Sequence, residues 1–141
     1  MKLEIGYNHS FEIRRETCVT NCQDNFSILY LSDLHLNKFS QGISERISTT
    51  IEELNPTAIL FGGDYVDSQK GLIYLNNMLR SLSHRQNIFA IAGNHDYYYG
   101  IDEIKKSMTE NNVVWLEKKT VCLNLGNTKI KIDGNFTNNE T

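Results

Sequence analysis

Apolar and polar positions along this chain follow two different periods, one typical of buried strands and one typical of amphipathic helices. Near-continuous apolar runs at 26–31, 57–61 and 87–92 predict strands that are buried on both faces. Between these runs, apolar residues recur at helical spacing over 43–54 and 72–82, which predicts two amphipathic helices. Two successive strand-helix-strand units predict an α/β fold in which parallel strands are joined by right-handed crossovers.

The segment before the first buried strand predicts an antiparallel leading hairpin. Apolar residues alternate loosely through 3–7 and 11–19, the pattern expected of two short strands with one face toward the core. The side chains expected to face inward are Phe11, Ile13 and either Cys18 or Val19.

The segment after the third buried strand predicts one more helix and three short strands. The helix is expected at 101–110, and the strands are expected at 113–116, 121–125 and 129–132. Gly126-Asn127 lies between the last two strands and has the composition of a tight hairpin turn.

Length and charge limit the classes of protein to which this fold can belong. The chain of 141 residues fits a single domain, and its 40% hydrophobic and 22% charged content is ordinary for a globular protein. A net charge of -3 without any Lys/Arg block argues against a broad nucleic-acid-binding surface. No apolar stretch is long enough to span a membrane and residues 1–10 lack a signal-peptide core, so a cytoplasmic location is expected, with peripheral membrane contact left open.

The three cysteines predict neither a disulfide framework nor a strong zinc site. Cys18, Cys22 and Cys122 form an odd set without a Cys-x2-Cys pair. Cys18 and Cys22 are spaced as Cys-x3-Cys with no second pair, which is a weak zinc signal. Reduced, half-buried thiols are therefore expected.

Three short polar segments carry the candidate chemistry, and each of them follows one of the buried strands. In chain order they are Ser-Asp-Leu-His at 32–35, Gly-Gly-Asp-Tyr-Val-Asp at 62–67 and Gly-Asn-His-Asp at 93–96. His35 lies 29 residues before Asp64, and Asn94 lies 30 residues after it, which is about the length of one strand-helix-strand unit. Because the carboxyl ends of parallel strands meet at one edge of a sheet, the three segments are expected to meet there.

The residue types in these segments are those of a site for divalent cations. Asp33 and His35, separated by one residue in extended backbone, are expected to point the same way and to bind one cation. Asp64 offers two carboxylate oxygens that can bridge two cations roughly 3.5–4 Å apart, and Asn94 offers a neutral carbonyl oxygen. Such a cation pair polarises a phosphoryl group and activates a water, so hydrolysis of a phosphate ester is the expected reaction.

His95 and Asp67 are the expected proton-transfer residues. His95 would donate a proton to the leaving alkoxide, and Asp67 would orient the imidazole ring and keep it cationic. Tyr97, Tyr98 and Tyr99 either line the mouth of this site or belong to a helix that packs on its rim. Taken singly, each polar segment also suits a plain role as a turn or a helix cap, but all three at matched spacing favour the metal site.

These segments resemble the first three signature blocks of the calcineurin-like metallophosphoesterases, D-x-H, G-D-x-x-D and G-N-H-D/E, in order and in spacing. The resemblance implies a sandwich of α-β-β-α layers and a di-metal centre, often with manganese, iron or zinc, that hydrolyses phosphodiesters or phosphomonoesters. The sequence looks more like the bacterial branch of phosphodiesterases and lipid-directed pyrophosphatases than like the protein Ser/Thr phosphatases. The resemblance implies that Asp33 and His35 bind the first metal ion, that Asp64 bridges both ions, and that Asn94 binds the second. It also implies that His95 is the proton donor and is paired with Asp67.

The chain departs from the pattern of that family after residue 96. The family continues with a lone His and then a G-H-x-H block, and nothing in this sequence matches either of them. Residues 1–141 are therefore interpreted as the N-terminal part of a single phosphoesterase domain, with an incomplete sandwich. The first metal ion would have three protein ligands, Asp33, His35 and Asp64, whereas the second would have only Asp64 and Asn94. Weak binding of only one ion is therefore expected.

An incomplete sandwich has consequences for packing and for function. One face of the sheet would lack a partner and expose a large apolar patch, which predicts a homodimer or a second polypeptide that supplies the missing half. Three functions stay open: a metal-dependent phosphoesterase with impaired activity, a non-catalytic interaction module, and a fragment of a truncated or split phosphoesterase.

Overall fold

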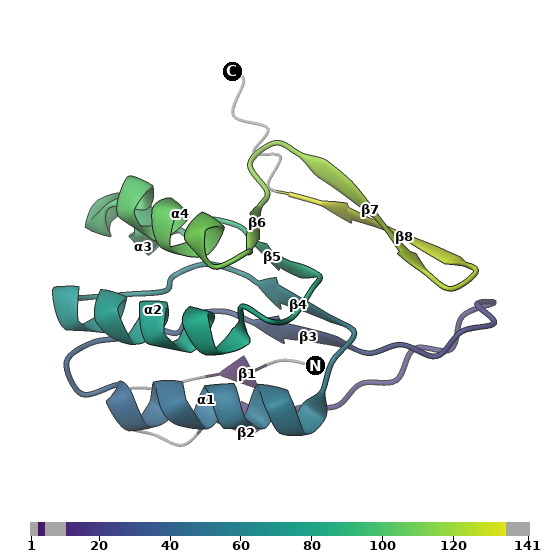
Figure 1. Cartoon of the computed structure of the whole chain (residues 1–141), viewed down its shortest axis with the longest axis horizontal. Helices are drawn as coiled ribbons and strands as arrows, with labels where there is room; N and C mark the ends of the chain where they lie inside the picture. Colours follow the sequence, from purple (N-terminus) through teal and green to yellow (C-terminus); the bar gives the residue numbers. More distant parts are fainter. Residues whose placement is uncertain (1–2, 5–10, 135–141) are drawn as a thin grey trace.

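The computed structural model describes residues 3–4 and 11–134, and its main element is a six-stranded sheet (Figure 1). Its strands are β1 (Leu3–Glu4), β2 (Glu12–Ile13), β3 (Ile28–Leu31), β4 (Ala58–Phe61), β5 (Ile88–Ala90) and β6 (Val114–Trp115). They lie in the order β2-β1-β3-β4-β5-β6. Neighbouring strands are parallel, except for β1 and β2, which pair antiparallel. The predicted α/β fold with a parallel sheet is confirmed.

Three helices lie side by side along one face of the sheet (Figure 1): α1 (Gln41–Leu54), α2 (Gln69–Leu82) and α4 (Ile101–Glu110). They pack there through the apolar positions that recur at helical spacing, because these side chains form one stripe on each helix. Ile47 of α1 and Leu75 of α2 are at most 1% exposed and belong to the main core of the molecule. Within the described residues, no helix is long and apolar enough to cross a membrane.

The opposite face of the sheet is covered in part by a hairpin of two strands, β7 (Thr120–Leu125) and β8 (Thr128–Asp133). Leu125 pairs with Thr128, so residues 126–127 make the predicted two-residue turn. Leu123 of β7 is buried against Phe89 of β5 in a second, smaller apolar cluster. The expectation that this face of the sheet has no partner is therefore wrong for the part that lies under the hairpin.

The leading hairpin is present but is shorter than the apolar pattern predicts. β1 and β2 pair over two residues each, and residues 5–7 of the expected first strand lie outside the described residues. Phe11 packs against the core as expected, whereas Ile13 is 38% exposed and Val19 is 95% exposed. Ile13 nevertheless lines a small apolar pocket with Phe11 and Leu29, so its side chain faces the core as predicted. Neither Cys18 nor Val19 faces inward, because residues 14–19 form no strand that would direct alternate side chains toward the core.

All three cysteines are among the described residues, and each of them is a free, exposed thiol. The expected half-buried state is wrong for a local reason in each case. Cys18 and Cys22 lie in the segment between β2 and β3 that has no regular structure. Cys122 lies on β7 beside the buried Leu123, and successive side chains of a strand point to opposite faces.

Candidate functional site

The three polar segments meet at the carboxyl ends of β3, β4 and β5, where the parallel topology predicts them. Main-chain hydrogen bonds join the first two segments: Asp33 N donates to Gly63 O at 3.0 Å, and His35 N donates to Asp64 O at 3.0 Å. The third segment joins them through His95 N, which donates to Asp64 Oδ1 at 2.9 Å. The expectation that the three segments share one edge is therefore confirmed.

Three of the candidate ligands have left-handed backbone. The φ angles of Asp33, His35 and Asp64 are 56°, 43° and 56°. The extended backbone expected between Asp33 and His35 is therefore wrong, yet both side chains leave the core, because the alternating Leu34 and Leu36 are at most 2% exposed. Left-handed backbone costs a non-glycine residue about 1–3 kcal/mol, although Asp and His adopt it more readily than most residues do. Such backbone is concentrated at functional sites in proteins.

Asp33, His35 and Asp64 form a group that could hold one metal ion. Each offers one ligand atom, and these atoms lie within 4.8 Å of one another. Two carboxylates and one imidazole are a donor set that suits borderline divalent ions such as Zn²⁺, Mn²⁺ and Fe²⁺. Asp33 is exposed and the other two are half-buried, so solvent reaches the group. The residues present therefore fit a divalent metal ion.

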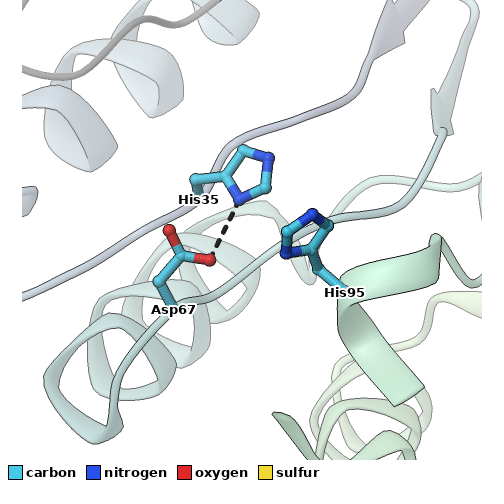
Figure 2. A group of neighbouring side chains, drawn as sticks. All are labelled: His35, Asp67 and His95. Atoms are coloured by element: carbon cyan, nitrogen blue, oxygen red, sulfur yellow. Dashed lines mark hydrogen bonds and ion pairs between the residues drawn. The ribbon is translucent and has the colours of Figure 1, made fainter. Parts of the chain in front are cut away.

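His35 also belongs to a second group, with Asp67 and His95 (Figure 2). His35 Nδ1 and Asp67 Oδ1 are hydrogen-bonded at 2.9 Å, and the two imidazole rings meet edge to face with centroids 4.9 Å apart. The structure thus gives Asp67 a hydrogen bond with His35, whereas its expected orientation of the His95 ring stays a prediction. The cause is the path of the chain, since Asp67 N donates to Leu36 O at 2.8 Å and this places Asp67 beside the first loop.

The Asp67–His35 hydrogen bond has a chemical consequence. A carboxylate that accepts a hydrogen bond from one ring nitrogen of a histidine fixes the tautomer and leaves the other nitrogen as a lone-pair donor. For His35 the bonded atom is Nδ1, so Nε2 is the nitrogen left for a metal ion. The side chains of Asp67 and His35 are 37% and 29% exposed, so the pair is only partly shielded from water.

Asn94 and His95 are the first two residues of α3 (Asn94–Tyr99), a short helix that begins at the second residue of the third polar segment. Both side chains are exposed at the edge where the other segments meet. His95 is fixed through its main-chain N–H group, which donates to Asp64. The six candidate site residues thus all lie in the segments that directly follow β3, β4 and β5, at one edge of the sheet.

Tyr97, Tyr98 and Tyr99 form the last part of α3, and a helix at these tyrosines was one of the two expected interpretations. Tyr97 and Tyr98 are 63% and 89% exposed. Tyr99 is half-buried, packs against the main core, and its hydroxyl donates to Gln69 Oε1 at 3.0 Å. Burial raises the pKa of the Tyr99 hydroxyl, with a smaller contribution from the charge of Glu103.

Asp96 had no role in the expectations from sequence, yet it is the only charged side chain among the described residues that is fully buried. Its Oδ2 accepts hydrogen bonds from Gly93 N at 2.7 Å and Asp64 N at 2.8 Å, and its Oδ1 accepts one from Tyr65 N at 3.0 Å. Burial raises the pKa of the Asp96 carboxyl, while the three N–H donors oppose that rise. The available signal was an acidic residue three positions after a helix-capping glycine.

The loops after β4 and β5 touch through their backbones at Gly63 and Gly93. The φ of Gly63 is 103°, which favours glycine, and a Cβ atom there would collide with the main chain of Gly93. A Cβ atom at Gly93 would lie 2.5 Å from Asp64 N and 2.7 Å from Asp64 Cγ. The two glycines therefore allow Asp64 to lie directly against the start of α3.

Comparison with known proteins identifies related sequences. A family model described as Calcineurin-like phosphoesterase matches residues 26–139. Phosphodiesterase YaeI of Escherichia coli is 38% identical over 82 residues, which cover 55% of this chain and 30% of that protein. UDP-2,3-diacylglucosamine pyrophosphatase LpxG of Chlamydia muridarum is 37% identical over 73 residues, which cover 50% of this chain and 22% of that protein. The uncharacterized metallophosphoesterase YkoQ of Bacillus subtilis is 29% identical over 115 residues, which cover 77% of this chain and 42% of that protein.

The matched region includes all three polar segments, since these lie between residues 32 and 96. A parallel sheet with helices packed on it is consistent with the fold of that family. The chain spans less than half of the length of these relatives, from 22% of LpxG to 42% of YkoQ.

Proposed function

This chain belongs to the calcineurin-like phosphoesterase family, and on that premise we propose that it takes part in metal-dependent hydrolysis of phosphoester bonds. The observation that carries the proposal is the convergence of Asp33, His35 and Asp64, whose ligand atoms lie within 4.8 Å of one another. Two relatives are named a phosphodiesterase and a pyrophosphatase, which supports a reaction at phosphorus. Phosphodiesters or phosphomonoesters are the proposed substrate class.

Asp33, His35 and Asp64 are the proposed ligands of one divalent ion, with manganese, iron and zinc as the candidates. When bound, such an ion polarises a phosphoryl oxygen and lowers the pKa of a coordinated water. A second ion would share Asp64 and take the amide oxygen of Asn94. Two protein ligands rarely hold a transition metal tightly, so one exchangeable ion is proposed for this chain.

His95 is the proposed proton donor to the leaving oxygen. Its imidazole is exposed, and its ring borders that of His35 at a centroid distance of 4.9 Å, so a substrate on the ion would lie within its reach. The proposed role of Asp67 is to orient His35 through the 2.9 Å hydrogen bond. Asp67 also lies beside His95 in the group of Figure 2, so orientation of the His95 ring for proton transfer stays part of its proposed role.

The proposed organisation is that residues 1–141 form the N-terminal part of a single domain. The family model matches one continuous stretch, and strands β3 to β6 share a core with α1, α2 and α4. A single cooperative unfolding transition, seen alike by circular dichroism and by Trp115 fluorescence, would support this organisation. Two separate transitions would contradict it.

The test of function is hydrolysis of bis(p-nitrophenyl) phosphate by the purified chain with added MnCl₂. Asp64→Ala removes the carboxylate that joins the metal group to His95 and is expected to abolish metal-dependent turnover. Glu53→Gln is the matched control, because it neutralises an exposed carboxylate on α1. It is expected to retain full activity. Turnover that persists in Asp64→Ala, or that does not depend on Mn²⁺, would contradict the proposal.

A non-catalytic interaction module is the second candidate function. The observation that favours it is the small number of expected ligands for a second ion, which are Asp64 and Asn94 alone. His95→Ala separates the two functions, because it should lower turnover and leave partner binding unchanged. A wild-type chain that binds Mn²⁺ but hydrolyses no phosphoester would favour the interaction module.

A further inference from the structure

Asp96 is fully buried beneath a site whose other candidate residues are exposed or half-buried. A buried carboxylate is costly unless its oxygens are fully hydrogen-bonded. In this structure the two oxygens accept three main-chain N–H groups, from Asp64, Tyr65 and Gly93, at 2.7–3.0 Å. Asp96 therefore connects parts of the chain about 30 residues apart in sequence through backbone groups alone.

The loop after β4 and the start of α3 each donate hydrogen bonds to the other. Asp64 and Tyr65 follow β4 and donate to Asp96 in α3, while Asp64 Oδ1 accepts a hydrogen bond from His95 N in the same helix. The link fixes Asp64 twice, once through its main-chain N–H and once through its carboxylate. Asp64 needs such support because its φ of 56° is left-handed.

We propose that Asp96 is a positioning residue that holds Asp64 in its metal-binding conformation. The inference rests on the proposed function, in which Asp64 is one of three ligands of the ion. Asp96 acts through Asp64 N, and its own carboxylate is enclosed by the loops that it joins. Groups that orient a metal ligand typically change metal affinity by about 10–100-fold when they are removed.

Two substitutions remove different numbers of these hydrogen bonds. Asp96→Ala removes all three. Asp96→Asn can keep an oxygen for the N–H groups of Asp64 and Gly93, but it then presents an amide donor to the N–H group of Tyr65. Mn²⁺ affinity is therefore expected to fall from wild type to Asp96→Asn and further to Asp96→Ala.

Asp24→Ala is the matched control. Asp24 Oδ2 accepts hydrogen bonds from Asn127 N at 3.0 Å and Thr128 Oγ1 at 3.1 Å, so this carboxylate also joins segments that are distant in sequence. It precedes β3, whereas the candidate site follows β3. This substitution is expected to lower thermal stability and to leave Mn²⁺ affinity unchanged.

The first measurement is titration of each purified variant with Mn²⁺, with free Mn²⁺ followed by electron paramagnetic resonance. The temperature is one at which circular dichroism shows all variants to be folded. The dissociation constant is expected to rise roughly tenfold or more in Asp96→Ala, by less in Asp96→Asn, and not in Asp24→Ala. A folded Asp96→Ala that binds Mn²⁺ as tightly as wild type would overturn the inference and leave the metal site standing.

The second measurement is amide hydrogen exchange in metal-free protein. Exchange at Asp64, Tyr65 and Gly93 is expected to become at least about tenfold faster in Asp96→Ala and to stay unchanged in Asp24→Ala. A wild-type chain that fails to bind Mn²⁺ would overturn the proposed function, and exchange alone would then decide the inference. Faster exchange confined to these three amides supports the positioning role, and unchanged exchange overturns it.

Discussion

Gly93→Ala tests the close contact on which the geometry of the site depends. Gly93 has φ -97° and ψ 176°, which alanine adopts without strain, so the substitution adds a methyl group and no backbone cost. That methyl carbon would lie 2.5 Å from Asp64 N and 2.7 Å from Asp64 Cγ. The side chain of Asp64 can rotate away, but its main-chain nitrogen is held by Asp96 at 2.8 Å. The loops after β4 and β5 must therefore separate.

The expected magnitude follows from two opposing effects. Overpacking at a tight contact costs about 1–3 kcal/mol, while replacing glycine by alanine stabilises by about 0.4–1 kcal/mol through the unfolded chain. The free energy of unfolding should thus fall by roughly 0–2.6 kcal/mol. Mn²⁺ affinity should fall as well, because Asp64 carries a proposed ligand oxygen.

Gly42→Ala is the control for this experiment. Gly42 is exposed in the first turn of α1, and a Cβ atom there meets nothing within 4 Å. The same chemical change is therefore expected to raise the free energy of unfolding by about 0.4–1 kcal/mol and to leave Mn²⁺ affinity unchanged. Urea denaturation and Mn²⁺ titration of the two variants measure both quantities. If Gly93→Ala were as stable as Gly42→Ala and bound Mn²⁺ like wild type, the close contact would be refuted.

Three further predictions concern other contacts. Asp67→Ala should weaken Mn²⁺ binding about 10–100-fold in a titration, because it frees the ring of His35; unchanged affinity would mean that Asp67 has no role in metal binding. Arg85 lowers the pKa of Glu52 below its ordinary value of 4.5, so the stability that this carboxylate contributes is present above about pH 4.5 and is lost as the pH falls through the lower folded pKa. Glu52→Gln should therefore lower the melting temperature more at pH 7 than at pH 3; an equal decrease at both would contradict this. Tyr65→Phe removes a buried hydroxyl that donates to a main-chain oxygen at 2.6 Å, and urea denaturation should show a loss of about 1–2 kcal/mol; no loss would refute the bond.

The central part of the fold could be predicted because its signal is periodic. The parallel strands β3, β4 and β5 lie within the predicted runs, and α2 carries its apolar residues at the predicted spacing. The extent of the leading hairpin could not be predicted as well, because strands of two residues contain too little alternation to show where they end. The hairpin of β7 and β8 was predicted as strands, but its packing over the second sheet face depends on tertiary contacts that no local pattern contains.

The sequence was sufficient to predict which loops form the candidate site. It was not sufficient to predict the backbone angles and hydrogen-bond partners of the residues in those loops. Parallel topology brings Asp33, His35 and Asp64 together whatever their backbone angles are. Their left-handed angles depend on hydrogen bonds between the loops, and the partner of Asp67 depends on which imidazole faces it. Sequence spacing fixes neither of these. The spacing of Gly93 and Asp96 indicates a helix cap, but it does not indicate that the carboxylate would be buried under the loops.

The backbone strain at this edge also shows where the site obtains its rigidity. Three left-handed residues at about 1–3 kcal/mol each amount to several kcal/mol, a large fraction of the 5–15 kcal/mol that stabilises a typical domain. Such strain persists only where surrounding contacts over-determine the backbone. Here those contacts join the loops to one another, through Gly63 O, Asp64 O and the carboxylate of Asp96. The proposed metal group of Asp33, His35 and Asp64 is therefore preorganised by contacts within residues 32–96. We accordingly expect a measurable affinity for Mn²⁺ in this chain, to which any further ligand would add.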